Sequence, residues 1–172
     1  FMKGKLNGFA GELPTLSDWE NHLSVVFPEV RLKQFLEMRG ADGGSWANLC
    51  GLPAFWVGLL YEPESLNACY DLIFDWSQEE HEYLRKEVPI TALKTKFRGK
   101  VLRELALDIL DLAHRGLRKR NYLDSVGIDE AHFLNPLFTI AESGITPAEE
   151  LLRAYERRWK KSVLPVYSEY AY

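Results

Sequence analysis

Hydrophobic residues recur every three or four positions along much of this chain, which is the period of a helix with one buried face. The clearest example predicts a helix from about residue 99 to residue 118. The buried face of that helix would carry Leu102, Leu105, Ala106, Ile109, Leu112, Ala113 and Leu117. The apolar run at 52–61 predicts a core helix, because it is too short to cross a membrane and is interrupted by Pro53 and Gly58.

Polar residues mark where several helices begin. In a capping box, a hydroxyl side chain accepts a hydrogen bond from an early backbone N–H, and a glutamate three positions later bonds back to the cap. Proline suits the first helical position, where its missing N–H costs nothing. We expect capping boxes at Ser17 with Glu20, at Ser77 with Glu80 and at Thr146 with Glu149, and prolines that open helices at Pro63, after Glu62, and at Pro147.

Residues 30–39 follow a different pattern, in which side chains alternate between two faces as in a β-strand. One face would carry Leu32, Leu36 and Met38, and the other Arg31, Lys33, Phe35, Glu37 and Arg39. A single strand has no ladder partner, so we expect its sheet neighbours to lie largely outside this chain, in a longer polypeptide or another subunit. The segments 1–9 and 163–170 are weaker strand candidates.

Composition narrows the class of protein. A length of 172 residues suits one domain or one segment of a longer protein, and a hydrophobic content of 47% argues against disorder. The net charge of −4 gives no reason to expect a nucleic-acid partner, and no segment reads as a membrane span or a signal peptide. Two cysteines favour a reducing compartment. We therefore expect a cytoplasmic protein with no nucleic-acid or membrane partner.

The charged side of the expected strand is the main candidate for chemistry. Glu37 and Arg39 are two residues apart and so share a face. A carboxylate on a rigid strand can bind Mg²⁺, and a neighbouring guanidinium can hold phosphate oxygens with two hydrogen bonds. The alternative is a solvated face of cross-strand ion pairs, and alternation alone does not separate the two. Asp42, in the glycine-rich turn at 40–44, is either a further metal or substrate ligand or a turn former.

The remaining reactive residues form no recognisable motif. The two cysteines, Cys50 and Cys69, are expected to be small buried groups. Basic clusters at 114–120 and 153–161 lie near predicted helix C-termini, where the helix dipole favours cations, and this explains them better than nucleic-acid binding does. The histidines, which lack metal-ligand spacing and are expected to be surface or packing residues, are His22, His81, His114 and His132.

The run FPEVRLKQFLEMRGADGGSWANLCGLPAFWVGLLY at 27–61 closely resembles a segment of the glutamate–cysteine ligases of plants and proteobacteria. The usual pattern in that family is RLKRYLEMRGADGGPW, followed by LPAFWVGLLYD. The resemblance continues through DWSQEE at 75–80, HFLNPL at 132–137 and SVLPVYSEYAY at 162–172. It thus covers nearly the whole chain.

This resemblance implies the first step of glutathione synthesis. ATP would phosphorylate the γ-carboxylate of L-glutamate, and the amine of L-cysteine would attack the acyl phosphate. The resemblance also implies Mg²⁺ held by several carboxylates. On the family's E-x-R motif, Glu37 would be a metal ligand and Arg39 the catalytic contact to the transferred phosphate. Arg31 and Lys33 would be weaker candidates for binding at the same anionic site, beside Asp42.

The implied fold class is α+β, a predominantly helical segment packed on strands of an antiparallel sheet whose other strands lie mostly outside this chain. Because family enzymes are far longer, we expect a C-terminal segment that is inactive alone and is completed by the remainder of the ligase or a second subunit. A helical binding or assembly module without enzymatic activity is the second hypothesis.

Cys50 matches a cysteine that plant enzymes use in a redox disulfide, with its partner upstream of this chain. Departures from the family pattern are Gln34 and Phe35, in place of Arg-Tyr, and Ser45 and Lys96, each in place of a proline.

Overall fold

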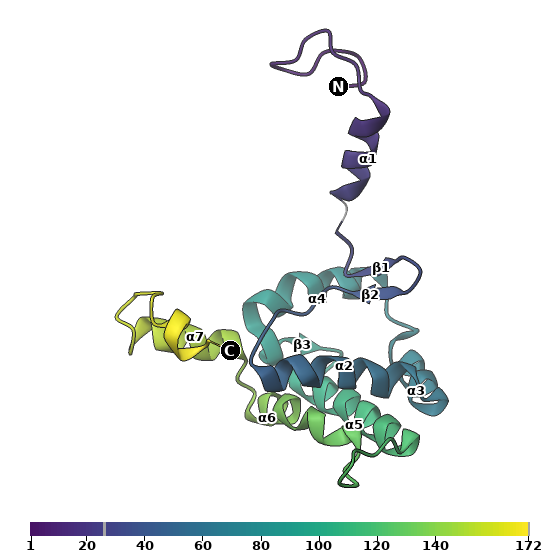
Figure 1. Ribbon diagram of the computed structural model, residues 1–172, viewed down its shortest axis with the longest axis vertical. Coiled ribbons are helices and arrows are strands. Elements are labelled where there is room, and N and C mark those ends of the chain that lie inside the picture. Colours follow the sequence, from purple (N-terminus) through teal and green to yellow (C-terminus); the bar gives the residue numbers. More distant parts are fainter. Residues whose placement is uncertain (26, 172) are drawn as a thin grey trace. The chain divides into compact units, whose positions relative to one another are not determined.

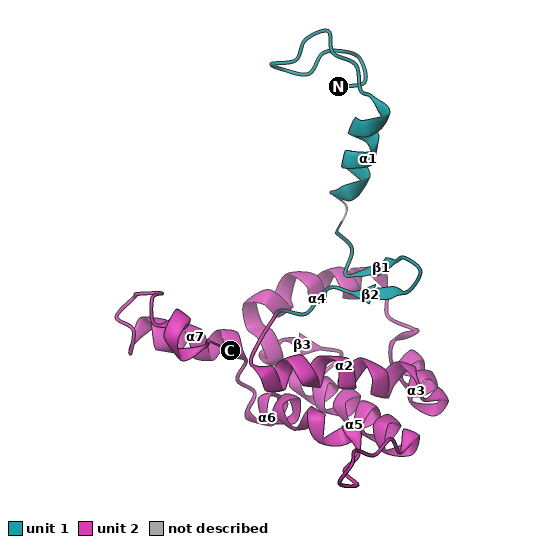
Figure 2. Ribbon diagram, viewed as in Figure 1, with its two compact units in different colours: residues 1–42 teal, residues 43–172 magenta. Residues whose placement is uncertain are grey.

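The computed structural model describes residues 1–25 and 27–171 and divides the chain into two compact units, Phe1–Asp42 and Gly43–Tyr172 (Figures 1 and 2). The first unit contains α1 (Leu16–Ser24), β1 (Val30–Leu32) and β2 (Leu36–Met38). The second unit contains α2 (Trp46–Leu60), α3 (Pro63–Ile73), α4 (Gln78–Thr91), the 3₁₀ helix η1 (Ala92–Lys94), β3 (Lys96–Phe97), β4 (Lys100–Val101), α5 (Leu102–Arg120), the 3₁₀ helix η2 (Glu130–Leu134), α6 (Asn135–Ser143), α7 (Pro147–Glu156) and α8 (Val166–Glu169). The fold is α+β and mostly helical, as predicted. Among the described residues, no helix is both long and apolar enough to span a membrane.

Most of the predicted helix starts are confirmed. Capping boxes are present at Ser77 with Glu80 and at Thr146 with Glu149, and prolines open α3 at Pro63 and α7 at Pro147. The box predicted at Ser17 and Glu20 is wrong, because α1 begins earlier. Its cap is Thr15, and the Asp18 carboxylate accepts a hydrogen bond from the Thr15 backbone N–H at 2.7 Å. Asp18 therefore makes the return hydrogen bond to the cap that the predicted box assigned to Glu20.

The segment 30–39 is a hairpin and not the single strand that the alternation predicts. Strand β1 pairs with β2 in antiparallel register, and the chain turns at residues 33–35. The segment thereby supplies one ladder partner for backbone groups that a lone strand would leave unpaired. Cross-strand partners point to the same side, so the alternation survives, with Arg31 opposite Glu37 on one face and the pairs Val30–Met38 and Leu32–Leu36 on the other. Further sheet strands outside this chain stay a prediction.

A second hairpin precedes α5 and shifts the start of that helix from the predicted residue 99 to Leu102. Its two-residue turn is Arg98-Gly99, and both residues have positive φ, 47° and 78°. This is the backbone conformation of tight hairpin turns, which glycine adopts at no steric cost. Neither of the weaker strand candidates, 1–9 and 163–170, forms a strand, and the second contains α8 instead.

Direct contact between the backbones of α2 and α5 forms the centre of the second unit (Figure 1). A Cβ atom on Gly116 would lie 1.9 Å from the carbonyl oxygen of Gly58, and one on Gly58 would lie 2.2 Å from that of Ala113. Only glycine allows helices to approach this closely. The buried side chains around this crossing are Ala54, Leu59, Leu112, Ala113, Leu117, Ala131 and Leu134. Three residues of the face predicted for α5 are thus buried, and its other four are half-buried.

Polar contacts hold α3 against the same crossing. The buried Ser65 hydroxyl donates to the carbonyl oxygen of Leu112 in α5 at 3.1 Å. Glu62 caps α3 by accepting from the Ser65 backbone N–H at 2.8 Å, and its other carboxylate oxygen lies 3.3 Å from the Lys119 ammonium. The buried carboxylate is therefore neutralised by a cation from α5.

Arg98 ties the second hairpin to the end of α3 and the start of α4. Its guanidinium donates to both carboxylate oxygens of Glu80, at 2.6 and 2.7 Å, and to the Asp75 carboxylate at 2.7 Å. These bonds, with the Ser77 backbone N–H, lower the pKa of Glu80 to about 2. Beside them, the buried Phe97 ring meets Trp76 edge to face, with 4.8 Å between centroids.

We predict that Gly116→Ala destabilises the second unit by roughly 2–4 kcal/mol, because the new methyl group overlaps the Gly58 carbonyl and the helices must move apart. The free energy of unfolding in urea measures this effect. Gly40→Ala is the control, since a Cβ there meets nothing within 4 Å, and should change stability by less than about 0.5 kcal/mol. Equal effects of the two substitutions would contradict the backbone contact.

We predict that Glu80→Gln lowers stability at pH 7 and that this difference disappears in acid. The folded-state pKa of Glu80 is about 2, below its ordinary 4.5, so its stabilising effect is full above the ordinary value and is lost as pH falls towards 2. Urea midpoints of both proteins between pH 7 and pH 2 test this. Glu104→Gln is the control, because Glu104 is exposed and has no ion-pair partner in the described part of the chain. A difference that persists unchanged at pH 2 would refute the role of Glu80.

Candidate functional site

The first hairpin brings Arg31 and Glu37 into direct contact. They occupy opposite positions on β1 and β2, and the Arg31 Nε–H donates to Glu37 Oε2 at 2.7 Å. About a third of each side chain is exposed, at 35% and 32%. The pair is thus partly shielded but open to a ligand.

Several cations act on the Glu37 carboxylate. The hydrogen bond from Arg31 is the largest cause that lowers the pKa of Glu37, and partial burial opposes it. The charges of Arg31, Lys33 and Arg39 lower this pKa further. Glu37 is therefore ionised at neutral pH, as a metal ligand must be.

Arg39 follows β2 directly and is oriented by two contacts. Its backbone N–H donates to the carbonyl oxygen of Glu29 at 2.8 Å, and its guanidinium lies 5.1 Å from the centre of the Phe27 ring. The Nη1 atom of Arg39 is buried and has no hydrogen-bond partner among the described residues. A buried donor of this kind is costly unless an acceptor meets it. The sequence pattern gave no indication of the Phe27 contact.

The other two predicted site residues are less constrained. Lys33 lies in the turn of the hairpin with an exposed side chain, and within the described part of the chain only its backbone forms a hydrogen bond, to the Phe35 carbonyl oxygen at 2.9 Å. Asp42 is exposed and outside both strands. The structure therefore joins Arg31 with Glu37, sets Lys33 and Arg39 near enough to act on that carboxylate, and does not place Asp42 with them.

The donor set for a metal ion is partial. Glu37 fits one position, because it is ionised and, among the described residues, only its Oε2 accepts a hydrogen bond, which leaves Oε1 available. Within residues 1–25 and 27–171, however, no three His, Cys, Asp or Glu side chains lie close enough to hold a metal. Mg²⁺ accepts one or two protein carboxylates together with phosphate oxygens and water. Glu37 could thus contribute to a magnesium site, with further ligands from elsewhere.

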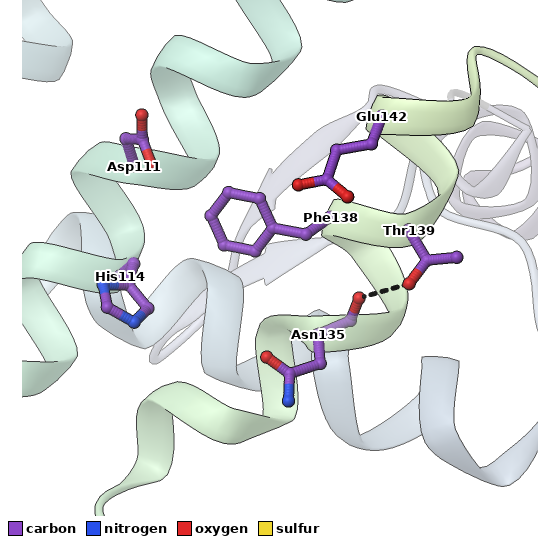
Figure 3. A pocket seen from close by; sticks show the side chains of 6 residues that line it. All are labelled: Asp111, His114, Asn135, Phe138, Thr139 and Glu142. Carbon is purple, nitrogen blue, oxygen red and sulfur yellow. Dashed lines mark hydrogen bonds between the residues drawn. The ribbon is translucent and has the colours of Figure 1, made fainter.

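A polar hollow of about 390 Å³ lies between α5 and α6 in the second unit (Figure 3). Its lining residues are Asp111, His114, Asn135, Phe138, Thr139 and Glu142. The His114 ring meets Phe138 edge to face, with 6.1 Å between centroids, which agrees with the packing role expected for the histidines. No sequence motif links these residues, so the sequence alone does not reveal this hollow.

Three cations of the first basic cluster pair with carboxylates. Lys119 contacts Glu62 and Glu64, Arg118 lies 3.7 Å from Asp129, and Arg120 lies 3.7 Å from Glu130. These ion pairs connect the C-terminal end of α5 to the start of α3 and to the start of η2. This is consistent with the helix-end interpretation of that cluster.

Comparison with known proteins gives one consistent result. The family model described as "Glutamate-cysteine ligase family 2(GCS2)" matches residues 3–169. Over 172 residues the chain is 55% identical to glutamate–cysteine ligase A, chloroplastic, of Oryza sativa subsp. indica, 54% identical to the chloroplastic enzyme of Arabidopsis thaliana, and 51% identical to that of Nicotiana tabacum. The alignments cover all of this chain and 34%, 32% and 32% of those proteins. The chain therefore spans about a third of the length of the curated relatives it matches.

The same relatives correct the expected location. Absence of a recognisable targeting segment and the low cysteine count suggested a cytoplasmic protein, but the matching relatives are named as chloroplastic enzymes, which contradicts that expectation. The expectation failed because neither a low cysteine count nor the absence of a targeting pattern distinguishes the cytoplasm from another reducing compartment.

We predict that Arg31→Gln raises the pKa of the Glu37 carboxyl towards its ordinary value, because the strongest hydrogen bond to the carboxylate is removed. NMR titration of the Glu37 side-chain carbonyl carbon measures this directly. Arg39→Gln is the matched comparison and should produce a smaller rise, since Arg39 acts on Glu37 through charge alone. A larger shift from Arg39→Gln would show that the hairpin pairs these residues differently in solution.

Proposed function

Because the chain belongs to glutamate–cysteine ligase family 2, we propose that it is the C-terminal part of an enzyme that joins L-glutamate to L-cysteine with consumption of ATP. The family match across residues 3–169 is the observation that carries this proposal. In the proposed reaction, ATP transfers its γ-phosphoryl group to the γ-carboxylate of glutamate. The cysteine amine then attacks the acyl carbon, phosphate leaves, and γ-glutamylcysteine forms.

The chemistry of the first hairpin supports this assignment. Phosphoryl transfer depends mainly on positioning and on neutralising the charge of phosphate oxygens. We assign Glu37 as one ligand of Mg²⁺, which when bound would supply that neutralisation. Arg39 would hold the transferred phosphate, and its unpartnered buried Nη1 supports this role. Lys33 and Asp42 remain weaker candidates for contacts to the substrates.

The isolated chain is proposed to be inactive. Its described residues contain no set of three metal-binding side chains, whereas about two thirds of each relative's length lies outside the matched region. We propose that the remainder of the ligase, or a second subunit, provides the other carboxylates and sheet strands. The alternative, a helical module without activity of its own, differs in one respect: it would bind neither Mg-ATP nor glutamate within the larger protein.

We predict that Glu37→Gln in the full-length protein lowers ligase turnover at least about 100-fold while leaving the fold intact, because a neutral amide is a poor magnesium ligand. Release of phosphate coupled to formation of γ-glutamylcysteine is the measurement, and circular dichroism reports on the fold. Turnover equal to that of the wild type would remove Glu37 from the site.

Two controls make this test specific. Glu20→Gln changes an exposed carboxylate of α1 in the same unit and should leave turnover unchanged. The 172-residue chain alone should show no turnover, and calorimetric titration with Mg-ATP and glutamate should detect no tight binding. Activity of the chain alone would show that the site is complete without further sequence.

A further inference from the structure

The contact between Arg31 and Glu37 uses only part of each group. Glu37 accepts through Oε2, and no hydrogen bond to Oε1 is recorded for the described chain. Arg31 donates through Nε, and none of its other N–H groups has a recorded partner there. A guanidinium has five donors in a rigid fork, so the edge formed by Nη1 and Nη2 remains able to hold a phosphate or sulfate with two hydrogen bonds.

Neither of the other nearby cations has this geometry. Lys33 acts on Glu37 through charge without a recorded hydrogen bond, and the same holds for Arg39. Arg39 is held against the Phe27 ring, with 5.1 Å from guanidinium to ring centre. Arg31 is therefore the cation positioned to touch the carboxylate and an anion at the same time.

The charges of this pair determine how it responds to ligands. While Arg31 and Glu37 neutralise each other, a metal ion gains little from approaching the carboxylate, because the adjacent guanidinium repels it. An anion on the outer edge of Arg31 offsets that repulsion. Hydrogen bonds to a ligating carboxylate also orient it, so Arg31 would keep Glu37 in place as the metal binds.

We propose that Arg31 is a positioning residue that couples metal binding at Glu37 to binding of a phosphate-like anion on its outer guanidinium edge. The proposal rests on the function proposed above, since it takes Glu37 as a metal ligand. Its consequence is that the metal and the anion each strengthen binding of the other, because such coupling is reciprocal. The site would therefore bind metal weakly until the phosphate of a nucleotide or acyl phosphate is present.

The test measures Mn²⁺ binding by electron paramagnetic resonance, with sulfate as the tetrahedral anion and chloride at matched ionic strength as the reference. In the full-length wild-type protein, sulfate should tighten Mn²⁺ binding at the Glu37-dependent site at least about fivefold. In Arg31→Gln this tightening should fall below about twofold. Binding in chloride should be at least as tight as in the wild type, because the competing cation is gone.

Two further variants separate the possible failures. Arg158→Gln removes a similar contact far along the chain, where the guanidinium lies 2.6 Å from the Glu169 carboxylate, and should keep the sulfate effect. Glu37→Gln should abolish the Glu37-dependent Mn²⁺ signal, and an unchanged signal would overturn the proposed function itself. If Glu37→Gln loses the signal but Arg31→Gln keeps the sulfate effect, or binds Mn²⁺ more weakly in chloride, only the role of Arg31 is overturned.

Discussion

The direct backbone contact between α2 and α5 is the constraint on which the second unit depends. Two glycines, Gly58 and Gly116, each cost a helix about 1 kcal/mol relative to alanine, and both lie where any Cβ would overlap the facing chain. The close approach brings the Leu59 and Leu117 side chains into the buried cluster. It also places the Leu112 carbonyl within reach of the Ser65 hydroxyl, so that α3 is fixed by the same contact. Gly58 and Gly116 thus lower the helix propensity of α2 and α5, and in return they allow α2, α3 and α5 to pack closely.

The described residues of the first unit form no comparable buried core. Among its described residues none is buried, and the apolar face of its hairpin exposes 80% of Leu32 and 59% of Leu36. A two-stranded hairpin is marginally stable by itself, and apolar surface of this kind calls for a covering partner. The residues assigned to phosphate and metal chemistry thus lie on the element that depends most on further sequence. This agrees with a chain that spans about a third of its relatives.

Local sequence signals predicted the helices well, because a cap is decided by residues three apart. Ser77 and Thr146 were identified in this way, and even the misplaced cap of α1 failed by only two residues. The hairpin at 30–39 could not be predicted, because its turn at Lys33 to Phe35 contains no glycine, proline, asparagine or aspartate. The glycine contact was also hidden, since a glycine within a helix pattern does not reveal which backbone it meets. Alternation nevertheless selected the correct face, because antiparallel partners keep the same side of the sheet.

Alternation along 30–39 left two interpretations open, an ion-pair surface or the floor of a site. The cross-strand pair exists, in the bond between Arg31 and Glu37. A surface pair of this kind contributes little to stability, so the pair alone gives no reason for three cations around one carboxylate. Arg39 differs from the other two cations, because its Nη1 is buried and lacks a hydrogen-bond acceptor in the described chain. The metal proposed at Glu37 and the anion proposed at Arg39 would together use both the ion pair and the donor that lacks an acceptor.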